Sequence, residues 1–175
     1  MRLWLVCLGA MWLAACGAIP ESVDAAGGLG PPVLRFAADG RISLRQEQRS
    51  DHLHFTWRHA PGRDNVLFSS PLGQGLAEMG RDAGGAWLVV PGQAERRSTD
   101  LRTLAQQVFG TPLPLDELAD WLGGARPELN GDVDGWRIAV TESAPYGRHR
   151  LPRRLEAQRG DVELKIVIDG WDEGG

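Results

Sequence analysis

The sequence predicts a mainly β fold with some α, in which a curved antiparallel sheet or open barrel carries two short helices. Three patterns predict it. Apolar and polar residues alternate up to about residue 97, apolar residues then recur at helical spacing between about 98 and 124, and alternation returns between 136 and 169. Because a sheet this long must curl and the helices must bury their apolar stripes, we expect the helices over its concave face.

The first sixteen residues have the anatomy of a secretory signal that ends in a cysteine. Arg2 precedes an apolar run from Leu3 to Ala15 that is too short to cross a bilayer as a helix. The order Leu-Ala-Ala-Cys resembles the bacterial lipoprotein signal, in which cleavage exposes the cysteine for lipid attachment. We therefore expect a signal peptide over residues 1–15, and a covalent diacylglycerol and N-acyl chain on Cys16. An ordinary secreted protein with a chance cysteine is the alternative.

The residues after the signal indicate where the domain lies. By resemblance to lipoproteins of double-membrane bacteria, Gly17 rather than aspartate permits export to the outer membrane. Acyl chains on Cys16 are sufficient for stable attachment, so we expect a lipid-anchored protein that faces the periplasm. The segment 16–34 contains AAGGLGPP and is expected to be a flexible tether. One domain is expected over 35–172.

Composition excludes several classes of protein. A chain of 175 residues with a formal net charge of −4 suits a single domain and lacks the basic balance of a nucleic-acid-binding protein. The only cysteine besides Cys16 is Cys7, which lies within the signal, so we expect no disulfide. The domain must therefore be held together by its core alone.

The first half of the domain has the pattern of an antiparallel meander. In DHLHFTWRH, Leu53, Phe55 and Trp57 alternate with polar residues, which is typical of a strand with one buried face. Ile42 and Leu44 alternate in the same way within GRISLRQ. NVLFSS, GLAEMG and AWLVV are further short candidates, separated by turn signals such as APGRD and RDAGG. Five or six strands are expected before the helices.

Two helices and then more strands complete the predicted order. The first helix follows cap residues at 98–100 and ends at Gly110, and the second runs from about Pro114 to Gly124. Alternation then resumes at Trp136 and Ile138 and again near the end of the chain. We expect three or four strands in this last part.

Motifs of catalysis are few. The sequence has no P-loop, no GxSxG nucleophile elbow and no zinc-spaced cysteine or histidine pair after the signal, so we expect no enzyme, no cofactor and no metal site. His52 and His54 share one face of a strand, but solvated strand residues are the simpler interpretation. Asp116, Glu117 and Asp120 have the chemistry of a general acid and base. Carboxylates at a helix N-terminus explain the first two with fewer assumptions.

Five tryptophans after the signal supply large side chains to the interior, where they either fill a core or line a cavity. They are Trp57, Trp87, Trp121, Trp136 and Trp171. Spacing alone favours a filled core, because aromatic residues at buried positions are usually packing.

A turn is expected at SSPLGQ, between two strands. Pro71 and Gly73 select a turn, but neither requires a leucine between them. Leu72 either begins the next strand and packs inward or protrudes into solvent, and spacing alone does not decide between the two.

Several of these segments, in this order, resemble the LolB family of outer-membrane lipoprotein receptors. They are the lipoprotein signal, FAADGRISLRQ, the F-x-W strand end, the SSPLGQ turn, LPLDELADWLGG and a last strand that ends in Trp171. The resemblance runs from about Phe36 to Trp171. One departure is that GGLGPPVLRF leaves little room for the helix that the family commonly has before its first strand.

The resemblance implies a half-open β-barrel capped by short helices, which encloses a hydrophobic cavity for acyl chains. It implies a monomer that takes acylated lipoproteins from a soluble, LolA-like periplasmic carrier and delivers them to outer-membrane lipid without nucleotide hydrolysis. The family's sensitive leucine stands in a protruding Pro-Leu-Gly turn, which assigns a membrane-insertion loop to Pro71, Leu72 and Gly73. Candidate cavity residues are Ile42, Leu44, Leu53, Phe55, Trp57, Leu101, Leu104, Trp121, Trp136 and Ile138.

Two other functions remain open from the sequence. A structural or assembly lipoprotein would have a filled core and a surface that docks an envelope protein. A lipid-modifying hydrolase is the other, although no nucleophile motif is present.

Overall fold

The fold is described from a computed structural model for residues 29, 31–126 and 128–172. The predicted signal, Cys16 and most of the predicted tether lie outside these residues. The strands are β1 (Phe36–Gln46), β2 (Arg49–Ala60), β3 (Arg63–Ser69), β4 (Gly75–Asp82), β5 (Gly85–Val89), β6 (Arg96–Ser98), β7 (Asn130–Val133), β8 (Trp136–Tyr146), β9 (His149–Arg159) and β10 (Val162–Asp172). The helices, α1 (Leu101–Phe109) and α2 (Leu115–Leu122), lie between β6 and β7 in the chain.

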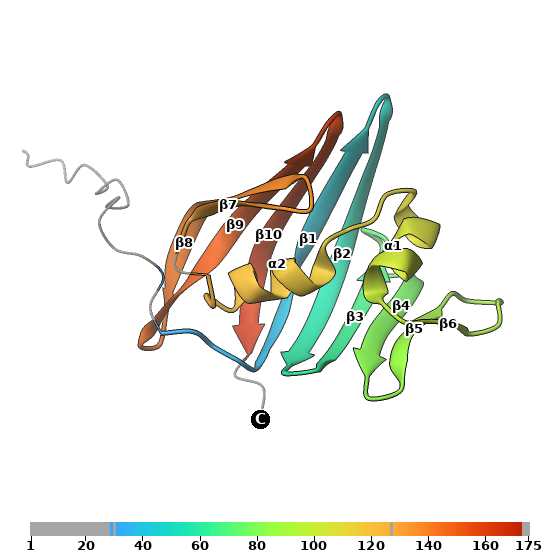
Figure 1. Cartoon of the computed structure of the whole chain (residues 1–175), viewed down its shortest axis with the longest axis horizontal. Helices are drawn as coiled ribbons and strands as arrows, with labels where there is room; N and C mark the ends of the chain where they lie inside the picture. Colours follow the sequence, from blue (N-terminus) through green and yellow to red (C-terminus); the bar gives the residue numbers. More distant parts are fainter. Residues whose placement is uncertain (1–28, 30, 127, 173–175) are drawn as a thin grey trace, which may run out of the picture.

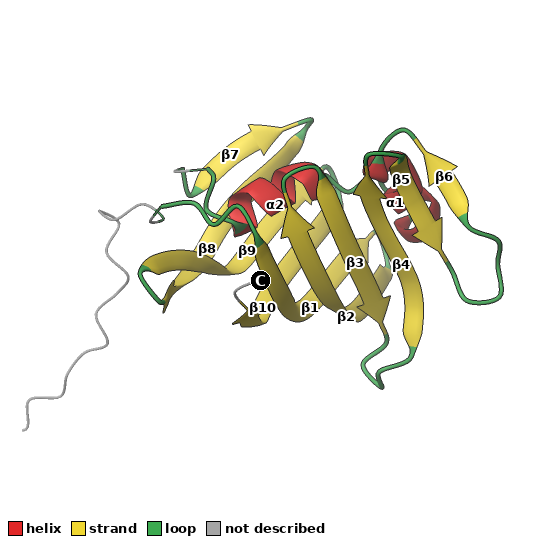
Figure 2. Ribbon diagram, turned by 90° about the horizontal axis from the view of Figure 1, so that it is seen from below, coloured by secondary structure: helices red, strands yellow, loops and turns green. Residues whose placement is uncertain are grey.

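All ten strands form one antiparallel sheet, in the order β6-β5-β4-β3-β2-β1-β10-β9-β8-β7. Six strands precede the helices and four follow them, which confirms the predicted order of elements. The first and last strands join the two halves, since Ile42 of β1 lies opposite Leu53 of β2 on one side and Ile166 of β10 on the other. Figures 1 and 2 show the sheet curving around both helices, as the mainly β, half-open fold requires.

Local sequence signals account for the ends of the helices. Asp100 caps α1 by accepting a hydrogen bond from the backbone N–H of Thr103 at 2.7 Å. Gly110 ends α1 in the left-handed conformation, with φ of 75°. Asp116 and Glu117 occupy the first turn of α2, where carboxylates complement the helix dipole.

The hydrophobic core lies between the concave face of the sheet and the two helices. Alternate residues of the strands point into it, and α2 contributes Leu115 and Leu118 from above. In Figure 1, α2 crosses the central strands and α1 lies over β4 and β5. The buried cluster is built from residues between Phe36 and Ile168, and Val33, which precedes β1, packs against it.

A short segment before β1 runs past the end of α2. The described residues from 31 to 35 contain no helix. The backbone N–H of Val33 donates to the carbonyl of Gly123 at 2.7 Å. Leu29 is also buried, and it lies beside Gly124 and Leu151. In the described part of the chain, this segment packs against the end of α2 and against Leu151 of β9.

Candidate functional site

The ten residues predicted to line a cavity all contribute to the interior of the half-barrel. Nine of them are buried and Leu53 is half-buried. The indole N–H of Trp121 donates to the carbonyl of Glu128 at 3.1 Å, and that of Trp136 to Pro112 at 3.2 Å. The structure brings the ten together, whereas their role in binding acyl chains stays a prediction.

The interior is closed in this structure. Beneath α2 the described residues leave a space of about 10 Å³, which has room for at most about one water molecule. It is lined by Ile42, Phe55, Trp57, Val66, Phe68, Leu115, Leu118 and Ile166. Leu115 and Leu118 of α2 fill the volume, as the spacing of the aromatic residues favoured.

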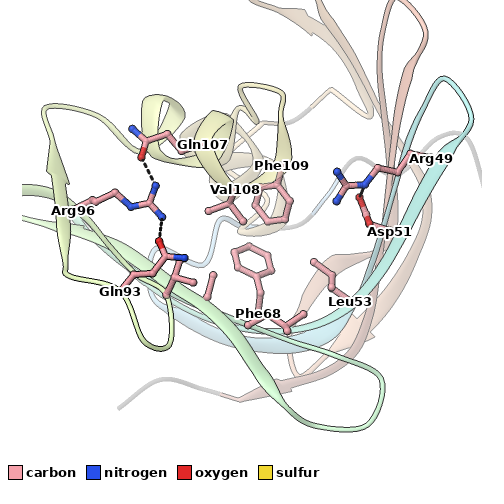
Figure 3. A pocket seen from close by; sticks show the side chains of 12 residues that line it. Arg49, Asp51, Leu53, Phe68, Gln93, Arg96, Gln107, Val108 and Phe109 are labelled. Carbon is pink, nitrogen blue, oxygen red and sulfur yellow. Dashed lines mark hydrogen bonds and ion pairs between the residues drawn. The ribbon is translucent and has the colours of Figure 1, made fainter.

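An apolar groove of about 320 Å³ opens at the end of the barrel that α1 covers (Figure 3). Its apolar residues come from β2, β3, β4, α1 and the residue after β5: Leu53, Phe68, Leu76, Ala77, Val90, Val108 and Phe109. Only Leu53 was among the predicted cavity residues. Val108 had a signal, since it lies on the predicted apolar face of the first helix. The others were missed because only the curvature of the sheet brings them under α1.

Phe68 connects this groove to the closed interior, because its side chain lines both. Its ring packs edge-on against Phe109, with the ring centres 5.0 Å apart, and in Figure 3 Phe109 points from α1 toward Phe68 on the sheet. A ligand that lies in the groove is therefore separated from the space beneath α2 by aromatic rings rather than by backbone.

The rim of the groove is polar. Arg49 and Asp51 form an ion pair of 2.8 Å on one side. On the other, Arg96 donates to the side-chain carbonyls of Gln107 at 2.9 Å and Gln93 at 3.0 Å. Figure 3 shows these groups around the apolar floor. The arrangement suits a ligand with an apolar tail and a polar head.

One carboxylate, Asp64, is buried within the half-barrel, with 2% of its surface exposed. It accepts hydrogen bonds from the indole of Trp57 at 2.9 Å and from the Nε of Arg81 at 2.7 Å, and it lies 2.7 Å from Nδ1 of His59. Burial acts to raise the pKa of Asp64. The hydrogen bonds from His59 and Trp57, with the charges of His59 and Arg81, outweigh burial and hold that pKa below its ordinary value.

Arg81 continues this network to α2. Its Nη1 lies 2.6 Å from Oδ1 of Asp116, while Arg102 of α1 lies 2.9 Å from Glu117. Burial raises the pKa of Asp116, and the charge of Arg81 opposes that rise. Of the three carboxylates considered as a general acid and base, Asp116 and Glu117 thus bind α2 to the sheet and to α1, while Asp120 lies 3.9 Å from Arg126. Asp64 and Arg81 were missed, because nothing local to Asp64 marks it as buried and nothing local to Arg81 marks it as the partner of Asp64.

The predicted turn between β3 and β4 presents Leu72 to solvent, with 97% of the residue exposed. The N–H of Gly73 donates to the carbonyl of Ser70 at 2.8 Å, and Gly73 has a φ of 84°, which favours glycine. Pro71 restricts the backbone just before Leu72. Leu72 is therefore held at the tip of a well-defined turn, which lies on the far side of the sheet from the helices in Figure 2. Its role in membrane insertion stays a prediction.

These features define an open half-barrel of one curved sheet with a helical cap, an apolar groove and a protruding apolar turn. The family model described as "Outer membrane lipoprotein LolB" matches residues 34–171. The chain therefore belongs to the LolB family. Membership makes it an outer-membrane lipoprotein of the lipoprotein localisation pathway, which confirms the family and the location expected from the sequence.

Relatives and solved structures agree with this assignment. An outer-membrane lipoprotein LolB from Thiobacillus denitrificans is 34% identical, with 98% of each chain covered. Another from Chromobacterium violaceum is 34% identical over 80% of this chain and 85% of its own. A LolA superfamily protein from Nitrosomonas europaea has a similar fold, with a TM-score of 0.54 at 10% identity, over 81% of this chain and 87% of its own. Neither helix in the described residues is long and apolar enough to span a membrane.

Proposed function

We propose that this protein accepts acylated lipoproteins from a soluble periplasmic carrier, holds their acyl chains in the groove beside α1 and transfers them to the membrane. The observation that carries the proposal is an open apolar groove whose floor residue, Phe68, also lines the interior. The groove has the size and apolar floor of a small-molecule binding site. Its polar rim can bind the glyceryl and peptide groups to which the chains are attached.

The acyl chains extend the groove into the interior as they bind. The space beneath α2 admits them only when Leu115 and Leu118 withdraw and the Phe68 and Phe109 rings turn aside. Each methylene that leaves water contributes about 0.8 kcal/mol, which offsets the cost of separating these contacts. The acyl chains then move from carrier to groove to bilayer because each site binds them more tightly than the one before. This transfer needs no nucleotide.

Replacing Val108 with glutamate tests the groove as the acyl-chain site. Val108 is half-buried in the groove wall, so a glutamate there reaches solvent while it places a charge beside the apolar floor. We expect Val108→Glu to reduce uptake of cargo from a preloaded carrier roughly tenfold or more, because a charge near an acyl chain is costly to desolvate. Transfer is measured by pull-down of residues 17–175 without nucleotide.

The matched control is Val89→Glu. Val89 is also half-buried but is not among the residues that line the groove. Both variants must retain the circular dichroism spectrum of the wild type. Equal transfer by Val108→Glu and the wild type would exclude the groove as the site.

The filled interior favours a second candidate, a structural or assembly lipoprotein that docks an envelope protein. Titration with a fluorescent apolar probe separates the two functions, since a permanently packed core offers no saturable site. Saturable binding that the cargo lipid displaces supports the acceptor. The absence of such binding by the folded domain supports the structural role.

A further inference from the structure

A second groove, of about 380 Å³, lies on the convex face of the sheet, opposite the helices. Five of the residues that line it are basic: Arg41, His52, His54, Arg154 and Lys165. No lining residue is acidic, although the whole chain carries a formal charge of −4. Pro71 of the β3–β4 turn also lines it, so the groove adjoins the exposed Leu72.

Strand register explains why the basic residues are contiguous. Val167 of β10 lies between Arg154 of β9 and Arg41 of β1. On its other side, Arg41 lies opposite His54 of β2. Directly opposed residues on one sheet face have Cβ atoms about 5 Å apart. The row continues from His54 to Ser69, the last residue of β3. It therefore leads across five strands, from β9 to β3, to the turn that carries Leu72.

Carboxylates flank this row without lining the groove. Asp169 accepts two hydrogen bonds from Arg41, at 2.9 and 2.8 Å. The other two pairs are longer than hydrogen bonds, with Nζ of Lys165 3.8 Å from Glu156 and Nε of Arg154 3.6 Å from Glu142. Exposed ion pairs of this kind contribute little to the free energy of folding. Lys165 and Arg154 can therefore leave these carboxylates and bind a phosphate at small cost.

We propose that this convex groove binds the phosphate groups of anionic lipids at a membrane surface. A bilayer contact there brings apolar and cationic groups together, because Leu72 enters the acyl region while Lys165 and Arg154 lie at the level of the headgroups. Basic residues at an anionic surface each raise membrane affinity by about 1 kcal/mol, which is roughly fivefold in the partition coefficient. This inference rests on the proposed function in one respect only, namely that the cargo is delivered to a membrane.

Sedimentation of residues 17–175, which contain the whole described core, with lipid vesicles tests this site. Binding to phosphatidylcholine vesicles is compared with binding to vesicles that also contain phosphatidylglycerol. We expect the anionic lipid to raise the partition coefficient, and added salt to remove the increase. The double variant Arg154→Gln/Lys165→Gln is expected to lose roughly tenfold or more of the affinity for anionic vesicles and to bind neutral vesicles as the wild type does.

Arg58→Gln is the matched control, because Arg58 lies on the same strand and face as His54 but outside the groove, and we expect it to bind both vesicles normally. Equal binding to neutral and anionic vesicles by the wild type would overturn the proposal. Normal binding of the double variant to anionic vesicles would also overturn the proposal. That holds even if the double variant binds the carrier more weakly than the wild type does. Cargo uptake from the carrier is measured separately, so a failure of the acceptor function does not alter this result.

Discussion

Leu72 is an exposed side chain that folding does not require. Because 97% of it is exposed, Leu72→Glu is expected to change the free energy of unfolding by no more than about 0.5 kcal/mol. Burying a leucine in a bilayer contributes about 2 kcal/mol, and a charge there is unfavourable. We therefore expect this variant to accept cargo normally and to incorporate it into vesicles at least about tenfold more slowly.

Leu34→Glu is the control for that experiment, since Leu34 is 60% exposed but lies before β1 rather than in the turn. It is expected to incorporate cargo at the rate of the wild type. Incorporation by Leu72→Glu at that same rate would remove the insertion role of the turn.

Asp64 is the opposite case, because it is a buried, charged side chain. We expect its removal to lower the free energy of unfolding. Asp64→Asn leaves Arg81 without its buried carboxylate, and we expect the free energy of unfolding to fall by about 3 kcal/mol near neutral pH. Urea denaturation followed by circular dichroism measures this difference. Asp161→Asn, in the exposed turn before β10, is the control and should unfold like the wild type.

The same substitution makes a prediction about pH. The folded state holds the pKa of Asp64 below its value near 3.9 in the unfolded chain, so its contribution to stability is fully present above that value. It is lost as the pH falls through the folded-state pKa. We expect the stability difference between wild type and Asp64→Asn to shrink below about pH 4. A difference that stays constant down to the acid unfolding of both proteins would contradict this.

Helix α2 is the element that closes the interior, and its first turn forms ion pairs with Arg81 of β4 and Arg102 of α1. Arg81→Gln removes the charge that pairs with both Asp116 and Asp64, so we expect the backbone amides of α2 to exchange with solvent roughly tenfold faster, and to accelerate more than those of the sheet. Hydrogen exchange read by mass spectrometry reports this, with β1 and β10 as internal references. Arg45→Gln, which removes an exposed pair with Glu163, should leave α2 unchanged. Uniform acceleration across the sheet would indicate global destabilisation instead.

The closed half-barrel as a whole makes a kinetic prediction. Since the space beneath α2 is about 10 Å³, an acyl chain enters the interior only after the helix and the aromatic floor have moved. We expect the observed rate of binding of an apolar fluorescent probe to level off as probe concentration rises, at the rate of opening. Stopped-flow fluorescence measures this, and Arg81→Gln should raise the plateau. A rate that rises linearly throughout would indicate a site that is already open.

The fold and the candidate site were predictable to different extents. Alternation in DHLHFTWRH and the capped pattern after residue 98 placed strands and helices correctly, because a strand or a helix buries one face at a fixed local period. The groove was not predictable in the same way, since Leu76 of β4 and Val108 of α1 come from separate elements that only the curvature of the sheet brings together. The buried Asp64 had no local signal at all.

What the sequence determined by itself is the set of properties that depend on neighbours along the chain. These are the period of each element, the Pro-Leu-Gly turn that presents Leu72, and the motifs that indicated the LolB family. The tertiary structure alone decided that β1 pairs with β10, that α2 fills the interior, and that basic residues of four strands meet beside the turn. The physical reason is that the curvature of the sheet and the packing of its faces bring together residues more than a hundred positions apart. Local hydrophobic spacing predicts which face of an element is buried, but not which distant element it contacts.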